Sequence, residues 1–320
     1  MPAVFTTDMY EEFDLVCVLG PTACGKTRYA VDLARRMDAE IISADSRQVY
    51  RGMDIGTGKD LSDYGDVPYH MIDIADAGTK YNIFQYQKDA QAAYEDIVSR
   101  GKRAILCGGS GLYIESFCKG YSLPEVPEDQ ALRQELEQYD DATLIARLAS
   151  LKPLHNTTDY DTRKRLIRAL EIAIYEAGHP VDVTEAENRP DGAGAAAADA
   201  TADKKADAAT GTYPRNIKYI GLDISREERN ARIDRRLEAR LQEGMVDEVR
   251  RLLDSGIQAE DLIYYGLEYK FVTKFLIGEL SYDAMVDGLR TAIHQFAKRQ
   301  MTWFRGMERR GVEIEWVPCL

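Results

Sequence analysis

The sequence lacks several features that would place it among membrane or secreted proteins. No apolar run approaches the roughly eighteen residues that a membrane-spanning helix needs. The first fifteen residues carry acids where a secretory signal would carry bases followed by an apolar core. The five cysteines are scattered and form no CxxC pair. This pattern argues against a disulfide framework or a zinc site and predicts a cytoplasmic protein.

Basic residues are also scarce, with 41 Lys and Arg against 54 Asp and Glu and a net charge of −13. Taken alone, this balance argues against a general nucleic-acid binder, because phosphate contacts need clustered Lys and Arg. A local basic surface is still compatible with it. The 320 residues, 45% of them hydrophobic, are enough for a packed core with a smaller appended unit.

Strands and helices alternate over the first 120 residues. Short apolar runs predict buried strands at 14–20, 40–44 and 103–109, and helices are expected at 26–37 and 81–100. Such alternation indicates an α/β fold with a parallel sheet, in which ligands bind at the carboxyl ends of the strands.

From about residue 121 the pattern becomes helical. Helices are predicted at about 128–139, 141–151 and 159–177, with no convincing strand between them. The alternation then resumes with a strand at 217–224, two helices before Gly256, a helix at 281–308 and a final strand at 312–317. We therefore predict an α/β core from 1–120 and 213–320, interrupted by a helical insertion at 121–190.

Residues 191–212 belong to neither part. This segment is rich in Ala and Asp and contains no aromatic residue and no Leu, Ile or Val, so burial cannot offset the entropy of ordering it. We interpret it as a flexible surface insert, with a nascent helix as the alternative.

A phosphate-binding pattern follows the first predicted strand. The segment GPTACGKT matches GxxxxGK[ST] between a strand and a helix. The glycines let backbone amides turn toward phosphate oxygens, the helix adds its dipole, Lys26 adds a charge, and the Thr27 hydroxyl suits Mg²⁺. The predicted phosphate-binding residues are Gly20, Pro21, Thr22, Ala23, Cys24, Gly25, Lys26 and Thr27. The pattern predicts a diphosphate or triphosphate site and does not specify a nucleotide.

The acid that usually accompanies such a loop is missing, since the third strand ends in glycines. Asp45 directly follows the strand at 40–44, so its carboxylate should face the same crevice as the loop. It could act as a general base or orient metal-bound water. Capping of a following helix, shared with Ser46, is an equally reasonable interpretation.

Three segments are locally basic. They lie at 163–168, at 226–240 and at 290–310, and Trp303 and Phe304 stand among the bases of the third. For 226–240 the better interpretation is a solvated helix with ion pairs four residues apart. For 290–310, which has few matching acids, we expect contacts with an RNA backbone and a stacked base.

The motifs together resemble one family over nearly the whole chain. The chain resembles the tRNA dimethylallyltransferases, bacterial type, through GPTACGKT, ADSRQVYRGMDIGTGK (44–59), GGSGLYI (108–114), RLIRALEI (165–172), the segment around Arg232 and Arg236, and AKRQMTWFR (297–305). The resemblance implies a P-loop NTPase-like core with a helical insertion domain that grips tRNA.

It also implies a reaction, the transfer of a dimethylallyl group from dimethylallyl diphosphate to N6 of the adenosine 3′-adjacent to the anticodon, in tRNAs reading codons that begin with U. The implied cofactor is Mg²⁺, held by Thr27, and the implied partner is the anticodon stem-loop of tRNA, bound by a monomer. The implied catalytic residues are Asp45, Thr22, Lys26 and Arg236. The implied tRNA-binding residues are Asp45, Ser46, Arg47, Gln48, Ser110, Arg133, Lys164, Arg165, Arg168, Lys298, Arg299 and Gln300.

The sequence departs from the family pattern at a few points. Ser110 replaces the usual Thr, the G-Y-x-E segment reads YYGLEYK (264–270), and His294 stands where Arg is frequent. Two other functions share the phosphate loop and Asp45: an adenine-nucleotide isopentenyltransferase and a small-molecule P-loop kinase. The bases at 163–168 and 290–310 and the length of the insertion argue against the first. The helical insertion and KRQMTWFR (298–305) would have no explanation in the second.

Overall fold

The computed structural model describes residues 10–121, 126–152, 154, 162–178 and 213–319. The expected insert at 191–212 and the first residues of the helix expected at 159–177 lie outside this range. The chain divides into two compact units, each described here by itself. The core unit comprises Met1–Gly120 and Gly211–Leu320, and the helical unit comprises Tyr121–Thr210.

A six-stranded sheet forms the centre of the core unit, with strand order β4-β2-β6-β1-β7-β8. All five strand pairs in it are parallel, which confirms the expected parallel α/β fold. The strands are β1 (Leu15–Leu19), β2 (Ala39–Ala44), β4 (Tyr69–His70), β6 (Arg103–Gly108), β7 (Ile217–Asp223) and β8 (Ile314–Pro318). The strand β6 lies between β1 and β2, although it follows both in the sequence. The chain therefore adds strands on one side of β1 first and on the other side with β7 and β8. Ligands bind at such a switch point in parallel sheets.

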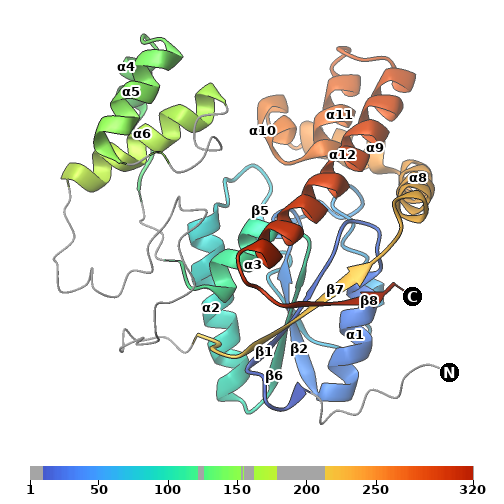
Figure 1. Cartoon of the computed structure of the whole chain (residues 1–320). Helices are drawn as coiled ribbons and strands as arrows, with labels where there is room; N and C mark the ends of the chain where they lie inside the picture. The colour runs from blue at the N-terminus through green and yellow to red at the C-terminus, as the bar shows by residue number, and fades with distance from the viewer. Residues whose placement is uncertain (1–9, 122–125, 153, 155–161, 179–212, 320) are drawn as a thin grey trace. The chain divides into compact units, whose positions relative to one another are not determined.

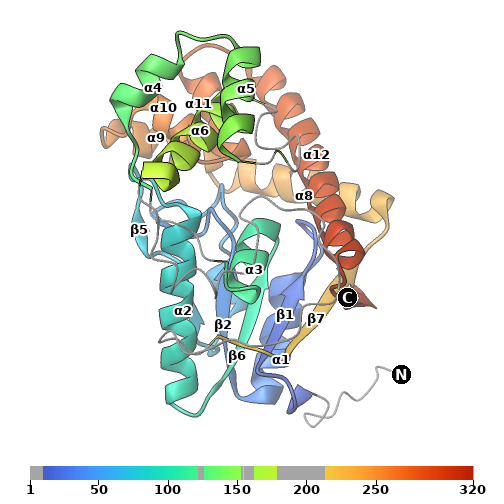
Figure 2. The ribbon, with the colours of Figure 1, turned by 60° about the vertical axis from the view of Figure 1, so that its left-hand side comes forward.

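Helices cover both faces of the sheet (Figures 1 and 2). Helix α1 (Lys26–Met37) packs on Val16 and Val18, and α2 (Ile83–Ser99) with α3 (Gly111–Cys118) packs on the opposite face. Side chains alternate along a strand, so β1 can supply both faces with apolar residues. Asn82 and Gln85 form a reciprocal cap that starts α2.

A second group of helices joins the core unit beyond the carboxyl ends of the strands (Figure 1). These are α8 (Arg226–Gln242), α9 (Met245–Asp254), α10 (Ala259–Tyr264), α11 (Leu267–Leu276) and α12 (Tyr282–Arg309). They pack around the buried side chains of Leu237, Val249, Leu262 and Leu289, together with the segment from Val49 to Met53. No helix among the described residues has the length and apolarity to cross a membrane.

The helical unit contains α4 (Gln130–Leu136), α5 (Asp141–Leu151) and α6 (Arg163–Gly178). Its own small core is built mainly from leucines of these helices, including Leu136, Leu144, Leu148 and Leu170. Asp129 and Asp140 accept hydrogen bonds from the first turns of α4 and α5 and so fix where these helices begin.

Sequence reasoning missed the shortest elements. The two-residue strands β3 (Tyr50–Arg51) and β5 (Ala75–Asp76) pair in a separate small sheet, and η2 (Leu61–Asp63) is a single 3-10 turn. Helices α10 and α11 were not expected either. The two-residue strands, the 3-10 turn and the six-residue α10 show too few periods for a hydrophobic pattern to be read.

Candidate active site

The phosphate loop connects the buried strand β1 to α1. Ala23 and Gly25 adopt left-handed conformations, with φ of 63° and 82°. This alternation curls the backbone so that successive amides face inward, which is the geometry of an anion-binding nest. A Cβ on Gly20 would lie 2.8 Å from Sγ of the buried Cys24, so the tight closure of the loop requires glycine there. The Lys26 ammonium donates to the carbonyl of Pro21 at 3.2 Å, across the mouth of the loop.

Gln300 of α12 fastens this loop to the end of β6. Its Oε1 accepts from the Thr22 amide at 2.8 Å, and its Nε2 donates to the Gly109 carbonyl at 2.9 Å. Gln300 is buried, with 7% of its surface exposed. We expected this residue to bind tRNA, whereas the structure engages both ends of its amide with the protein. These two hydrogen bonds hold the phosphate loop against the end of β6, and tRNA binding by Gln300 stays a prediction.

Asp45 directly follows β2, in a turn on the other side of β6. Its Oδ1 accepts from the Arg47 amide at 2.9 Å. The residues after Asp45 form a turn and not a helix, so the alternative in which Asp45 caps a helix is wrong. Ser110 ties this Asp45 turn to β6: its Oγ accepts from the Ser46 amide at 3.2 Å, and its own amide donates to the Ala44 carbonyl.

Glycines allow the two loops to approach each other at the end of β6. A Cβ on Gly108 would lie 2.2 Å from the Ala44 carbonyl oxygen. A Cβ on Gly109 would lie 2.4 Å from Nε2 of Gln300 and 3.4 Å from Cε of Lys26. The structure therefore brings the phosphate loop and the Asp45 turn together around β6, as the sequence predicted.

Gln48 and Arg47 extend from the Asp45 turn. Gln48 accepts from the Ser43 hydroxyl and donates to the Gly58 carbonyl, both at 3.2 Å. The guanidinium of Arg47 lies 5.9 Å from the ring centroid of Tyr264, which is a cation–π arrangement. Tyr264 lies in the segment that departs from the family pattern.

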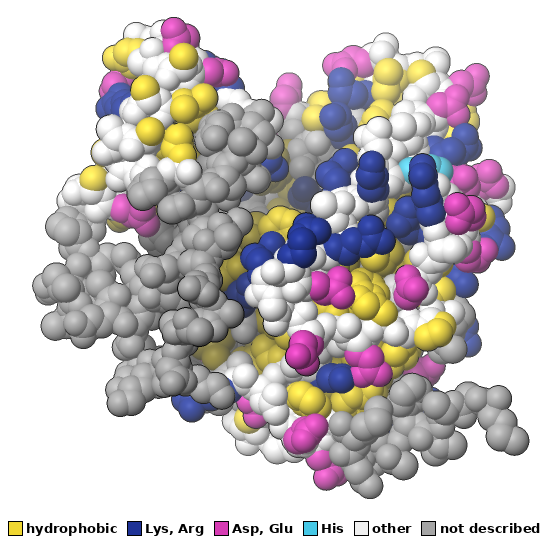
Figure 3. Space-filling model, viewed as in Figure 1, with side chains coloured by type: hydrophobic (Ala, Val, Ile, Leu, Met, Phe, Trp, Pro, Cys, Tyr) yellow, Lys and Arg dark blue, Asp and Glu magenta, His cyan; other side chains and the backbone are white. Residues whose placement is uncertain are grey.

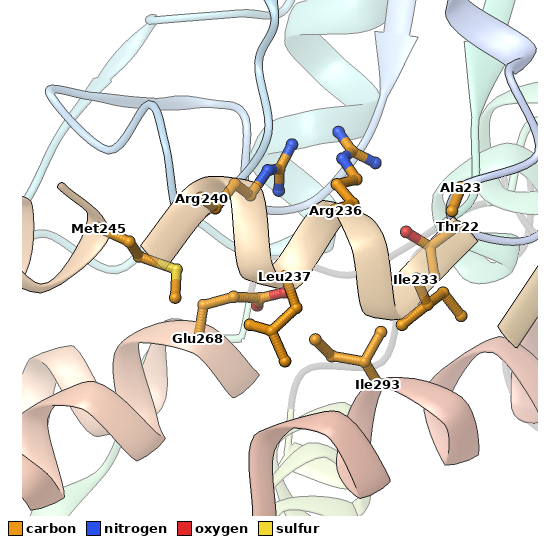
Figure 4. A pocket seen from close by; sticks show the side chains of 9 residues that line it. All are labelled: Thr22, Ala23, Ile233, Arg236, Leu237, Arg240, Met245, Glu268 and Ile293. Atoms are coloured by element: carbon orange, nitrogen blue, oxygen red, sulfur yellow. The ribbon is translucent and has the colours of Figure 1, made fainter. Parts of the chain in front are cut away.

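A pocket opens beside the phosphate loop (Figure 4). Thr22 and Ala23 line it from the loop and Arg236 from α8. The remaining lining is Ile233, Leu237, Arg240, Met245, Glu268 and Ile293. Arg236 donates to the Gly58 carbonyl at 3.3 Å and to Asp60 at 2.7 Å. Burial raises the pKa of Glu268, opposed by the nearby Arg240 and Arg236. The structure thus places Thr22, Arg236 and an apolar wall together.

Sequence reasoning missed Glu248, which holds residues 54–56 in place. The buried carboxylate of Glu248 accepts from the amides of Asp54, Ile55 and Gly56 at 2.8–3.0 Å and from the Tyr269 hydroxyl at 2.6 Å. A Cβ on Gly56 would lie 2.7 Å from the Tyr269 ring. No local sequence pattern predicts this contact, because the three amides that Glu248 binds stand more than 190 positions away in the sequence.

The C-terminal helix presents the basic surface expected from the sequence. Lys298, Arg299 and Trp303 are exposed on α12, and the Arg299 guanidinium lies 5.9 Å from the Phe296 ring centroid. Figure 3 shows Lys and Arg side chains forming a band over this part of the core unit. Arg310, which is also exposed, is paired with the buried Glu115 at 2.8 Å, so not every base of this segment lacks an acidic partner.

In the helical unit, two of the expected tRNA-binding arginines are engaged internally. Arg133 and Arg168 both pair with Glu171, which is 1% exposed, and Arg168 also donates to the Val126 carbonyl. Burial raises the pKa of Glu171, but the hydrogen bonds from the two arginines outweigh it and hold the pKa below its ordinary value. Lys164 and Arg165 are exposed on the same helix.

The residues present fit Mg²⁺ only in combination with a phosphate ligand. The described residues contain no group of three or more His, Cys, Asp or Glu side chains that could hold a metal. Thr27, in the first turn of α1, offers a hard hydroxyl oxygen. Mg²⁺ commonly takes one or two protein oxygens and completes its shell with substrate phosphates and water, which suits this site.

Comparison with known proteins identifies the family. The family model described as IPP transferase matches residues 48–307, and a second, described as Isopentenyl transferase, matches residues 13–64. Two similar relatives are tRNA dimethylallyltransferase 2 of Bacteroides fragilis, 54% identical over 96% of this chain and 94% of its own, and tRNA dimethylallyltransferase 2 of Porphyromonas gingivalis, 54% identical with the same coverage.

Solved structures show the same fold. The tRNA isopentenylpyrophosphate transferase of Bacillus halodurans is 32% identical, with a TM-score of 0.64 over 95% of this chain and 89% of its own. A eukaryotic dimethylallyltransferase acting on tRNA, 21% identical, has a TM-score of 0.72 over 95% of this chain and 73% of its own, which shows likeness of fold. The P-loop NTPase-like core expected from the sequence is confirmed. This chain belongs to the IPP transferase family, as a bacterial-type tRNA dimethylallyltransferase.

Proposed function

We propose that this protein transfers a dimethylallyl group from dimethylallyl diphosphate to N6 of the adenosine 3′-adjacent to the anticodon, in tRNAs that read codons beginning with U. One observation carries the proposal: the phosphate loop and the Asp45 turn directly follow β1 and β2, the two strands that pair with β6 on either side. The site for the diphosphate leaving group and the base for the acceptor amine therefore lie at the same edge of the sheet.

In this reaction N6 of adenine attacks C1 of the dimethylallyl group while the bond from C1 to the diphosphate oxygen breaks. Asp45 accepts the proton that the amine loses. The loop amides, Lys26 and Arg236 stabilise the negative charge that grows on the departing diphosphate, with Thr22 beside the bridging oxygen. Mg²⁺ bound through Thr27 and the phosphates would supply further positive charge to the same leaving group.

The apolar wall of the pocket supports a prenyl donor over a nucleotide. Ile233, Leu237 and Ile293 lie beside Thr22, where a dimethylallyl tail would extend from the loop. Burial of such a tail is favoured by about 25 cal/mol per Å² of apolar surface. For tRNA, the support is the exposed pair Lys298 and Arg299 on α12. We further propose that the protein is a monomer and that it is cytoplasmic. The free cysteines among the described residues support the second of these, because they suit a reducing compartment.

The test is incubation with labelled dimethylallyl diphosphate and, in parallel, total tRNA or AMP, followed by nuclease digestion and mass spectrometry. We expect label in N6-(dimethylallyl)adenosine from tRNA and none in AMP. Label in AMP would instead identify an adenine-nucleotide isopentenyltransferase, and phosphate transfer from ATP to a small molecule would identify a kinase. A tRNA transcript with guanosine at the target position serves as the matched control and should take up no label.

A further inference from the structure

Two guanidinium groups of α8 converge on one carboxylate. Nη2 of Arg236 lies 2.7 Å from Oδ2 of Asp60, and Nη2 of Arg240 lies 3.3 Å from the same oxygen. Residues four positions apart share one face of a helix, and Figure 4 shows both side chains leaving α8 toward the same side. The Asp60 side chain is half exposed. A single, partly hydrated carboxylate therefore faces two positive charges.

Arg240 is buried to a degree that is unusual for an arginine, with 8% of its surface exposed. A guanidinium has five N–H donors, yet among the described residues the hydrogen bond given to its side chain is the long one to Asp60. Burial and the neighbouring Arg236 lower the pKa of Arg240 to about 10, so the group is still charged at neutral pH. Because Arg240 shares Asp60 with Arg236, a further anion beside it would supply acceptors for its remaining N–H donors.

The backbone beneath the two arginines is shaped to receive them. Gly58 has φ of 67°, and a Cβ there would lie 2.0 Å from Nη2 of Arg240 and 2.4 Å from Nη2 of Arg236. Both guanidiniums thus lie against bare backbone, which Glu248 fixes through the preceding amides. Any side chain at position 58 would displace them.

The two arginines also line the same pocket as the phosphate loop, together with Thr22 and Ala23. An anion held at the loop would lie beside both side chains. We infer that Arg240 is a second arginine for the donor's diphosphate, and that Asp60 is the counterion from which both arginines are released when the diphosphate binds. This inference rests on the proposed function for the identity of the donor, but inorganic diphosphate alone suffices to test it.

The test is calorimetric titration of inorganic diphosphate, at a fixed Mg²⁺ concentration, into the full chain. Arg240→Met should raise Kd about ten- to a hundred-fold, the effect of losing a charged hydrogen-bonding partner. Arg240→Lys should restore part of the affinity, because it keeps the charge and loses the planar fork. Arg229→Met is the matched control, since Arg229 is equally buried on α8 and does not line the pocket; its Kd should equal that of the wild type.

Asp60→Asn should act in the opposite direction. It removes the competing charge, and Asn tolerates the left-handed conformation of residue 60, whose φ is 40°. We expect Kd for diphosphate to fall about two- to five-fold. If circular dichroism shows that Arg240→Met does not fold, this variant decides the matter.

An unchanged Kd in a folded Arg240→Met, or a Kd that is unchanged or raised in Asp60→Asn, would overturn the inference. Its failure can be told apart from failure of the proposed function. A wild-type protein that binds diphosphate through Arg240 but modifies no tRNA would contradict the function and leave the inference standing, whereas tRNA modification with Arg240 dispensable for binding would do the reverse.

Discussion

The phosphate loop and the Asp45 turn lie at one edge of the sheet, yet they are built in different ways. The loop takes its curl from its own backbone, through the left-handed Ala23 and Gly25, and Gln300 then fastens it in place. The Asp45 turn is shaped by partners from elsewhere in the chain, because Ser110 holds Ser46 across 64 positions. Local geometry can be recognised in a short motif, whereas a turn held by distant side chains cannot. The phosphate loop could therefore be assigned from its residues alone. For Asp45 the residues left two interpretations, a general base and a helix cap, and only the family resemblance favoured the base.

The largest effect should come from the acceptor side. Asp45→Asn keeps an Oδ1 that can accept from the Arg47 amide, so the turn should persist. Loss of a general base lowers the rate by about 10²–10⁴-fold. The rate constant measured in single-turnover assays should fall by this factor, while the Kd for dimethylallyl diphosphate stays close to that of the wild type. If donor affinity fell and turnover did not, Asp45 would be a structural residue.

On the donor side, Lys26→Ala should weaken donor binding and turnover together. Its ammonium acts on charge that is present in the bound diphosphate and grows in the transition state. Loss of a hydrogen bond to a charged group corresponds to about ten-fold or more in Kd. Arg28→Ala, an exposed base two positions along α1, is the control and should change neither quantity. Wild-type kinetics at low donor concentration would refute the phosphate-loop assignment.

In the helical unit, two of the arginines expected to bind tRNA pair instead with the buried Glu171. Glu171→Gln should destabilise this unit by about 1–3 kcal/mol, because Arg133 and Arg168 lose their shared carboxylate. The folded-state pKa of Glu171 is below its ordinary value, so its stabilisation is present above the ordinary carboxyl pKa and is lost as the pH falls through the folded one.

Urea unfolding across the acidic range measures this contribution. The wild type should lose stability on acidification, and Glu171→Gln should show a flatter profile. Glu135→Gln, on an exposed carboxylate of α4, is the control and should leave the profile unchanged. Equal profiles for the wild type and Glu171→Gln would show that the buried pair contributes nothing.

The smallest effects sharpen the contrast between the two loops. Gln300→Ala releases the Thr22 amide, and Ser110→Ala releases the Ser46 amide. Each variant loses a hydrogen bond worth about 1 kcal/mol, which corresponds to about a five-fold change in the donor KM or in kcat. Steady-state kinetics should show a raised KM for the donor in the first variant and a lowered kcat, with an unchanged donor KM, in the second. Identical effects would mean that the two loops are not separately positioned.

Most of the fold could be predicted because long elements carry many periods of their pattern. The expected helix at 26–37 matches α1, and the expected strand at 217–224 matches β7 within one residue. The final strand was expected at 312–317 and runs from Ile314 to Pro318, which is the ordinary uncertainty of an element's end. The elements that were missed are short and take their shape from packing against distant segments.

The site was predicted less completely, because several of its residues act through distant partners. The spacing of Arg240 suggested a solvated helix with ion pairs, which holds for Arg232 and Glu228 on the same helix. Burial of Arg240 depends on a loop near position 60, which the helical pattern does not encode. Gln300 stands in a basic, aromatic segment, so its contact with the phosphate loop could not be read from its neighbours.

We propose that the donor and the tRNA are bound by separate groups of residues: the donor by the phosphate loop and the tRNA by the C-terminal helix α12. The most direct test is Lys298→Glu combined with Arg299→Glu, both exposed on α12, with circular dichroism as a check on folding. We predict weaker tRNA binding and a log–log salt slope lower by about 0.7–0.9 for each tRNA phosphate that is no longer neutralised, with an unchanged Kd for dimethylallyl diphosphate. A folded double variant whose tRNA affinity and salt slope equal those of the wild type would contradict this claim.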